Sequence, residues 1–132
     1  MVVATKNFIL DTSVIVARLL EEKVSNSDIS HYLDLFYQKK IHFFSPPIIT
    51  TEVGNTLKSA VLSWRINPDK AHAILKHFMK LPIKFSSPDP QKILQLSISK
   101  ELSFYDATYL ALSEKLHLPL LTLDKKLAAL AK

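Results

Sequence analysis

Four short apolar runs, each separated from the next by one or two helical segments, constrain the fold of this chain more than any other feature. The runs lie at residues 8–10, 41–44, 83–85 and 120–123. Apolar residues at helical spacing predict helices over residues 12–20, 26–40, 45–64, 68–80, 89–100, 103–115 and 125–131. Because a parallel connection needs a long crossover, strands joined through helices pair in parallel. The sequence therefore predicts an α/β fold, a three-layer α/β/α sandwich around a short, mostly parallel sheet.

Polar and proline residues predict where several of these helices begin. Thr12 or Ser13 is expected to cap the first helix, and Ser45, followed by two prolines, is expected to cap the third. The third helix is predicted to carry one apolar stripe, which consists of Ile49, Val53, Leu57, Ala60, Val61 and Trp64. In the helix over 103–115, the residues expected to share one face are Tyr105, Tyr109 and Leu112.

The length and composition fit one soluble domain spanning residues 1–132. Apolar residues make up 48% and charged residues 22% of the chain, close to the average for globular domains. The absence of cysteine excludes disulfides, thiolate metal sites and thiol nucleophiles. The single glycine excludes a P-loop or a dinucleotide-binding fingerprint, since these need several glycines for a close approach to phosphate.

Hydropathy and charge indicate a location and a class of partner. No apolar run reaches the ~18 residues of a membrane span. Lys6 and Asp11 interrupt the apolar start of the chain, which argues against a secretory signal. We therefore expect a cytoplasmic protein that does not contact a membrane. The net charge of +5, carried mostly by Lys, permits loose attraction to a polyanion such as nucleic acid.

Four acidic residues lie where the predicted fold directs them to one edge of the sheet. Asp11 and Asp124 each follow an apolar strand, and ligand sites in open parallel sheets lie beyond the carboxyl ends of the strands. Glu52 lies beside the apolar stripe of its helix, and Asp106 lies in the first turn of an apolar helix. Both carboxylates are therefore expected to be partly buried and to need partners.

Each acid also has a purely structural interpretation. Asp106, three residues after Ser103, resembles part of a capping box, and Asp124 suits the N-cap of the last helix. Asp11 suits the cap of the first helix, and Glu52 suits a surface position on a helix margin. A single cause accounts for all four: a hard divalent cation, Mg²⁺ or Mn²⁺, prefers oxygen ligands and offsets repulsion between carboxylates. The five histidines lie outside these segments and are expected at the surface or the core margin.

The four acidic segments together resemble the PIN domain family. Residues 11–15 (DTSVI) resemble its first motif, residues 52–57 (EVGNTL) its second, residues 105–112 (YDATYLAL) its third and residues 121–127 (LTLDKKL) its fourth. Order, spacing and length agree over essentially the whole chain. The departures are mild: Gly54 stands beside the second acid, and no further acid follows Asp124.

The resemblance implies a metal-dependent ribonuclease, most similar to the VapC toxins of type II toxin–antitoxin pairs. The residues that it implies as catalytic acids and as ligands of Mg²⁺ or Mn²⁺ are Asp11, Glu52, Asp106 and Asp124. Those that it implies as supporting residues are Ser13, Asn55 and Thr122. Helix capping by Ser13 and strand-end hydrogen bonding by Thr122 are the alternative roles.

The expected reaction is hydrolysis of a phosphodiester in single-stranded RNA. One or two metal ions would orient a water in line with the leaving 3′-oxygen, giving a 3′-hydroxyl and a 5′-phosphate. No Ser-His-Asp or Cys-His arrangement is evident in the sequence, so a covalent intermediate is not expected. The lysines that are candidates for guiding the RNA are Lys23, Lys39, Lys40, Lys58, Lys125 and Lys126.

An antitoxin protein and a homodimer are the expected protein partners. The apolar side chains of the first two helices expected to be exposed for such partners are Leu19, Leu20, Tyr32 and Phe36. Two other functions remain as alternatives: a catalytically weak scaffolding module of the same fold, and a Mg²⁺-dependent phosphatase or phosphoacceptor. The latter would require further acids directly after the first strand, where Thr12 and Ser13 lie.

Overall fold

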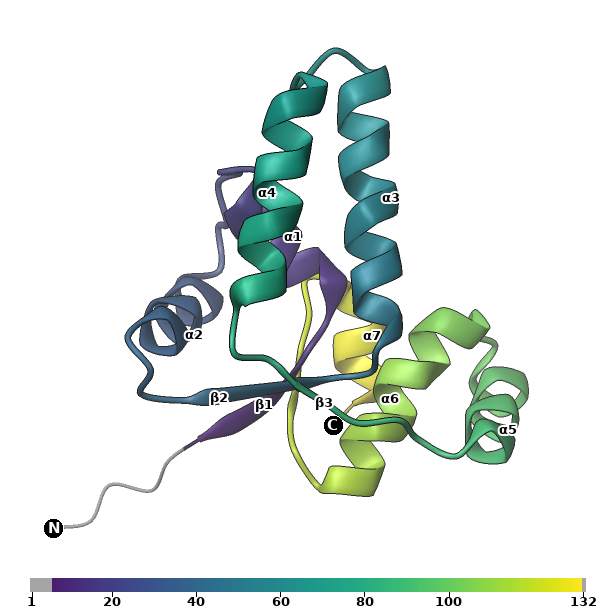
Figure 1. The fold of residues 1–132 in the computed structure, drawn as a ribbon. Helices are drawn as coiled ribbons and strands as arrows, with labels where there is room; N and C mark the ends of the chain where they lie inside the picture. Colours follow the sequence, from purple (N-terminus) through teal and green to yellow (C-terminus); the bar gives the residue numbers. More distant parts are fainter. Residues whose placement is uncertain (1–5, 132) are drawn as a thin grey trace, which may run out of the picture.

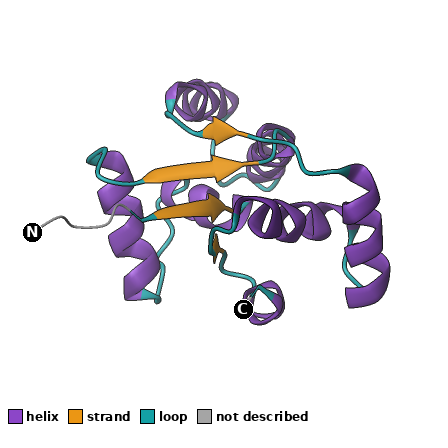
Figure 2. Cartoon of the chain, turned by 90° about the horizontal axis from the view of Figure 1, so that it is seen from below, coloured by secondary structure: helices purple, strands orange, loops and turns teal. Residues whose placement is uncertain are grey.

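A four-stranded parallel sheet forms the centre of the computed structural model, which describes residues 6–131 (Figures 1 and 2). The strands are β1 (Asn7–Leu10), β2 (His42–Ser45), β3 (Lys84–Phe85) and β4 (Leu120–Leu121). Their order in the sheet is β3-β2-β1-β4, and all three pairings are parallel. Strands β2 and β4 therefore lie on opposite sides of β1, so the strand order reverses beside β1. The carboxyl ends of β1 and β4 lie at this point, and α/β sheets commonly bind ligands there.

Helices cover both faces of this sheet. Within the described range they are α1 (Thr12–Leu19), α2 (Ser27–Tyr37), α3 (Ile48–Leu62), α4 (Pro68–Lys80), α5 (Pro90–Lys100), α6 (Phe104–Leu116) and α7 (Lys125–Leu130). Phe8 and Leu10 point to one face and pack in a core with residues of α1 to α4. Ile9, between them, points to the other face and packs on Tyr109 of α6. The alternation confirms the three-layer α/β/α sandwich predicted from the sequence.

The first two helices bury the apolar side chains that we expected to be exposed. Leu19 and Phe36 belong to the core, and Leu20 and Tyr32 are half-buried against it. The Phe36 ring stacks on Phe43 of β2 at a centroid distance of 4.3 Å. The expectation was wrong because four helices share one face of the sheet, which makes that core larger than the strands alone suggest.

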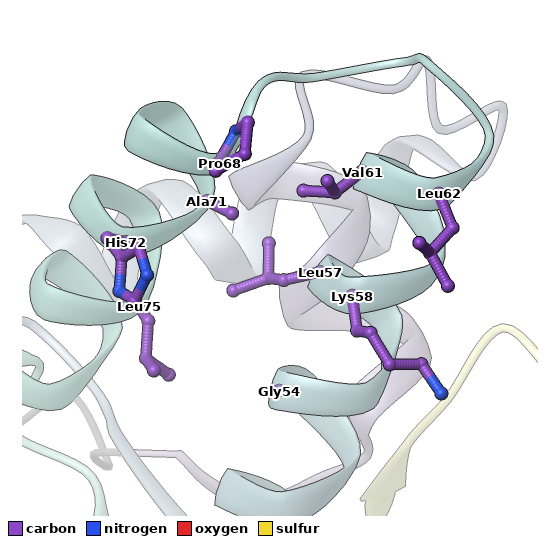
Figure 3. Close-up of a pocket in the computed structure, with 9 residues that line it drawn as sticks. All are labelled: Gly54, Leu57, Lys58, Val61, Leu62, Pro68, Ala71, His72 and Leu75. Atoms are coloured by element: carbon purple, nitrogen blue, oxygen red, sulfur yellow. The ribbon is translucent and has the colours of Figure 1, made fainter.

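Helices α3 and α4 form a hairpin that projects away from the strands (Figure 1). Between them runs an apolar groove of about 260 Å³, which Figure 3 shows lined by Leu57 and Val61 on α3 and by Ala71 and Leu75 on α4. The helix α3 ends at Leu62, and Trp64 is 94% exposed in the turn rather than part of the predicted apolar stripe.

Two predicted helix starts differ from the structure. The first helix begins at Thr12 after Asp11, with no side-chain cap, because the Ser13 hydroxyl donates to the Asp11 carboxylate instead. The third begins at Ile48 after Pro47, and the Ser45 hydroxyl donates to the Pro46 carbonyl rather than to the helix. The other ends agree with the predicted ranges to within three residues.

Several helices end on a residue with left-handed backbone geometry. Among the described residues, the non-glycine residues with positive φ are Glu21, Lys39, Trp64, Glu101 and His117. Glu101 and His117 directly follow a helix, and the other three lie two residues after the last helical residue, positions where glycine is the usual choice. The single glycine, Gly54, lies inside α3. Nothing approaches within 4 Å of the point where its Cβ would be.

None of the helices in residues 6–131 combines the length and hydropathy needed to cross a membrane.

Candidate functional site

Asp11 lies at the carboxyl end of β1 and is 7% exposed. Its Oδ2 accepts hydrogen bonds from the Ser13 and Thr122 hydroxyls, each at 2.7 Å. Ser13 is two residues further along the chain, whereas Thr122 directly follows β4. Because β1 and β4 are neighbours, the parallel sheet itself brings Thr122 to Asp11.

Further hydrogen bonds join the ends of the two strands. The Asp11 amide donates to the Leu121 carbonyl at 3.1 Å. The Leu123 amide donates to the Ser13 hydroxyl at 3.0 Å, and the Asp124 amide donates to the Thr122 hydroxyl at 3.1 Å. Both hydroxyls therefore connect the backbone after β4 with the carboxylate after β1, so these segments form a single hydrogen-bonded unit.

Glu52, on α3, is half-buried and contacts two hydroxyls from other elements. The Tyr109 phenol donates to Glu52 Oε1 at 2.5 Å, and the Thr12 hydroxyl donates to the same oxygen at 3.1 Å. The Thr12 and Tyr109 oxygens are 2.8 Å apart, within hydrogen-bond distance of each other. The start of α1, the first half of α3 and the middle of α6 thus meet at one carboxylate oxygen.

Asp11 and Glu52 share one pattern of engagement. Two hydroxyls bind one oxygen of each carboxylate. Within residues 6–131, no donor reaches Asp11 Oδ1 or Glu52 Oε2. Hydrogen bonds of this kind fix the orientation of a carboxylate while leaving its second oxygen available to a ligand.

Asp106 and Asp124 combine capping geometry with proximity to the other acids. Asp106 lies in the first turn of α6, where its amide donates to the Ser103 hydroxyl. Asp124 is the N-cap of α7, with Oδ1 accepting from the Leu127 amide at 3.0 Å. The caps predicted at Ser103 and Asp124 are therefore present, and they do not exclude a second role for either carboxylate.

The pKa values of Glu52 and Asp106 are both raised, in part by repulsion from neighbouring acids. Burial is the main cause that raises the pKa of Glu52, and the charges of Asp11 and Asp106 raise it further, whereas the Tyr109 and Thr12 hydrogen bonds lower it. Burial also raises the pKa of Asp106, followed by the charges of Asp11 and Asp124. Lys126 opposes this second shift. The fold therefore brings all four predicted acids into one electrostatically coupled cluster.

The donor set of this cluster fits a hard divalent cation. Within residues 6–131, no group of three or more Asp, Glu or His side chains is arranged to hold a metal ion by itself. However, Mg²⁺ is commonly bound by one or two carboxylates, with waters and substrate phosphate completing its shell. The unengaged oxygens of Asp11 and Glu52 and the like charge of the cluster suit that kind of site.

A cavity of about 300 Å³ opens beside Glu52. Its lining residues are Thr12, Thr51, Glu52, Asn55, Thr56 and Tyr105. Asn55 lies in this cavity with its side chain exposed, and it makes no hydrogen bond to any of the four acids. Of the three predicted supporting residues, Ser13 and Thr122 thus contact an acid directly, whereas Asn55 lies next to one.

Sequence reasoning missed Thr12, Tyr105 and Tyr109 as parts of this region. The sequence pattern predicts a helix cap at Thr12 and places Tyr109 on the apolar face of α6, and it assigns neither residue a contact with an acid. Tyr105 was expected to share that face, but it is 56% exposed while Tyr109 is buried. The available signal was the tyrosine hydroxyl itself, because a buried phenol needs a hydrogen-bond partner.

The fold and the acids together define the class of protein: a parallel α/β domain with a cluster of carboxylates where the strand order reverses. The particular family follows from comparison with known proteins. The chain belongs to the PIN domain family, whose family model matches residues 8–132.

One curated relative and one solved structure are similar to this chain. Ribonuclease VapC1 of Mycobacterium tuberculosis, found in two strains, is 31% identical to this chain over 120 residues, covering 89% of this chain and 76% of the relative. The crystal structure of PAE2754 from Pyrobaculum aerophilum superimposes with a TM-score of 0.76, covering 97% of this chain and 86% of that one. At 23% identity, this second likeness shows a shared fold.

Proposed function

We propose that this protein is a metal-dependent endoribonuclease that hydrolyses phosphodiester bonds in single-stranded RNA. The observation that carries the proposal is the paired arrangement of Asp11 and Glu52, each held by two hydroxyls through one oxygen. The similarity to Ribonuclease VapC1 supports RNA as the substrate. The electrostatic coupling of the four acids supports a cation as their counter-charge.

Asp11, Glu52, Asp106 and Asp124 would hold Mg²⁺ or Mn²⁺. When bound, the metal lowers the pKa of a water and offsets charge on the phosphate oxygens. The water oxygen bonds to phosphorus as the bond to the 3′-oxygen breaks. The leaving oxygen takes up a proton, and the products are a 3′-hydroxyl and a 5′-phosphate.

The surrounding side chains keep the acids in position during this reaction. Ser13 and Thr122 orient Asp11, and Thr12 and Tyr109 orient Glu52. Such supporting hydrogen bonds affect activity because the carboxylates need no rearrangement when the substrate arrives. Lys126, whose Nζ donates to the Glu101 carbonyl at 3.2 Å, lowers the pKa of Asp106, so we expect its charge to attract an RNA phosphate at the acids.

Cleavage of single-stranded RNA by the purified protein tests the proposal. Activity is expected with Mg²⁺ or Mn²⁺, to stop with EDTA, and to be lost in the Asp11→Asn and Asp106→Asn variants, both of which are expected to stay folded. Asp69→Asn is the matched control, because Asp69 is an exposed acid in the first turn of α4. RNA binding without cleavage would instead support a scaffolding module, and hydrolysis of a phosphomonoester alone would support a phosphatase.

We also propose that the protein acts in the cytoplasm as the toxin of a toxin–antitoxin pair, as a homodimer held inactive by a second protein. The similarity to Ribonuclease VapC1 supports the toxin role, and the proposed RNA substrate supports a cytoplasmic location. Expression alone is expected to inhibit growth, and expression from the native operon is expected to yield a complex with a small protein. A monomer with no effect on growth would leave the nuclease proposal standing without the toxin role.

A further inference from the structure

We propose that the cavity beside Glu52 is a nucleobase site, in which the base flanking the cleaved phosphate stacks on Tyr105. The inference rests on the proposed function and adds a binding site to it. The cavity is formed by the start of α1, the first half of α3 and the start of α6. It accounts for an exposed aromatic side chain and two unengaged polar side chains that the acid cluster leaves unexplained.

The position of the cavity ties it to the reacting phosphate. Glu52 contributes both to the acid cluster and to the cavity lining. Tyr105 directly precedes Asp106, so the first turn of α6 carries both a residue that lines the cavity and a second acid of the cluster. A nucleotide whose phosphate lies at the acids therefore has its own or its neighbour's base within reach of this cavity.

Tyr105 presents an aromatic surface that the core does not use. Its side chain is 56% exposed, whereas Tyr109, one turn further along α6, is 1% exposed. Unstacked bases of single-stranded RNA bind to aromatic side chains, and each such contact raises affinity by about five- to 150-fold. An exposed tyrosine at the edge of a nuclease site is suited to that contact.

Thr51 and Asn55 supply the polar groups that an RNA base requires. They lie one turn apart on the exposed face of α3. Neither side chain forms a hydrogen bond to another part of the chain described here. The Asn55 amide offers both a donor and an acceptor, as the hydrogen-bonding edge of a base does. The cavity therefore has groups that distinguish one base from another.

The charge of the lining favours a base over a phosphate. Glu52 is acidic, and none of the six lining residues is basic. A phosphate in this cavity would find no basic side chain in the lining to offset its charge, whereas a base is neutral. Lys126, the basic residue close to Asp106, does not line the cavity. The expected phosphate site near Lys126 is therefore separate from the proposed base site in the cavity.

Binding and cleavage assays on Tyr105 variants test this site. Affinity for a short single-stranded RNA of mixed sequence is measured in EDTA, where cleavage is off, and KM and kcat are measured with Mg²⁺. Tyr105→Leu is expected to raise Kd and KM about tenfold or more with little change in kcat, whereas Tyr105→Phe, which keeps the ring, is expected to recover most of the lost affinity. Trp64→Leu is the control, because Trp64 is an exposed aromatic at the distant end of the α3–α4 hairpin.

A modified substrate separates base stacking from other roles of Tyr105. The wild type is expected to bind weakly to an RNA that lacks the base next to the cleavage position. Tyr105→Leu is expected to bind this abasic RNA with the same affinity as the wild type does. Asn55→Asp is expected to change which base flanks the cleaved bonds, as mapped by sequencing the products. Wild-type affinity and KM in Tyr105→Leu, or equal losses on intact and abasic RNA, would overturn the site. The affinities measured in EDTA test the base site even if the protein does not cleave RNA, so failure of this proposal is distinguished from failure of the proposed function.

Discussion

The Tyr109 phenol donates a 2.5 Å hydrogen bond to Glu52 Oε1, although the two residues are 57 positions apart in the chain. Tyr109 is 1% exposed and packs with Ile9 of the sheet and Leu112 of α6. A side chain that belongs to the core on one side thus orients an acid of the candidate site at its polar end. The packed core therefore fixes the position of the Tyr109 hydroxyl, and this hydroxyl in turn fixes the orientation of the Glu52 carboxylate.

Tyr109→Phe removes this donor while keeping the ring. The Tyr109 hydrogen bond lowers the pKa of Glu52, so its loss raises that pKa, and the acid limb of the pH–rate profile is expected to move to higher pH. A drop in rate of about 10- to 100-fold is expected, as for other residues that orient metal ligands. RNA cleavage across a pH series measures both effects. Tyr105→Phe is the control, and an unshifted acid limb would show that Tyr109 does not act through Glu52.

Thr122→Val tests the hydroxyl that joins Asp11 to the end of β4. The variant keeps the shape of the side chain but removes the donor to Asp11 Oδ2 and the acceptor for the Asp124 amide. The free energy of unfolding is expected to fall by about 2 kcal/mol, because one of the lost bonds is to a charged group. Urea denaturation measures the change. Thr122→Ser is expected to restore most of it, and equal stability of the two variants would contradict the assignment.

The metal-free protein is expected to lose stability as the pH rises from acid to neutral. The folded state raises the pKa values of Glu52 and Asp106 above their ordinary 4.5 and 3.8. Between those values and the raised pKa values the folded protein binds more protons than the unfolded chain. This stabilisation is complete below about pH 4 and disappears as the pH passes the folded pKa values.

Melting temperatures in EDTA across this pH range measure the effect, with Asp106→Asn as the comparison. The variant lacks one of the repelling charges, so its stability is expected to decline less steeply. Added Mg²⁺ is expected to raise the melting temperature of the wild type at neutral pH more than that of the variant. Parallel curves for the two proteins would argue against electrostatic clustering of the acids.

Gly54→Ala is expected to stabilise the protein by about 0.5–1 kcal/mol, because glycine weakens a helix interior relative to alanine. The space around Gly54 is open: a Cβ there meets nothing within 4 Å. The added methyl group would point toward the groove between α3 and α4, which Gly54 helps to line. Thermal or urea denaturation checks the gain, and RNA cleavage should stay at the wild-type level. A destabilised variant would mean that the α3–α4 packing requires a glycine.

The sequence was sufficient to predict the layers of the fold and the region where the acids gather. Alternating apolar runs and helices determine a parallel sheet, and a parallel sheet places Asp11 and Asp124 at one edge. The helix ends were harder to predict. Trp64 fitted the apolar spacing of α3, but the helix ends at Leu62, two residues before it. Because no glycine follows this helix, the sequence gives no sign of the left-handed residue beyond its end.

The hydrogen bonds that orient the acids could be predicted only in part. Ser13 lies two residues from Asp11, so a local contact was foreseeable, and Thr122 follows the neighbouring strand. The contact of Tyr109 with Glu52 depends on how α6 packs against α3, which periodicity does not specify. The cavity that Tyr105 lines has the same origin, since three helices meet there only in the folded chain.

The left-handed residues at the helix ends bear on how far this protein is from its maximum thermostability. All five side chains are exposed, and an L-residue is strained in this conformation, whereas glycine is not. Replacement by glycine at each end would relieve that strain, partly offset by the greater freedom of glycine in the unfolded chain. Because the ends are distributed around the molecule, the gains should add. The stability of the fold is thus below its maximum at several independent helix ends. Substitutions at these ends, none of which carries one of the four acids, are expected to give a more heat-resistant protein.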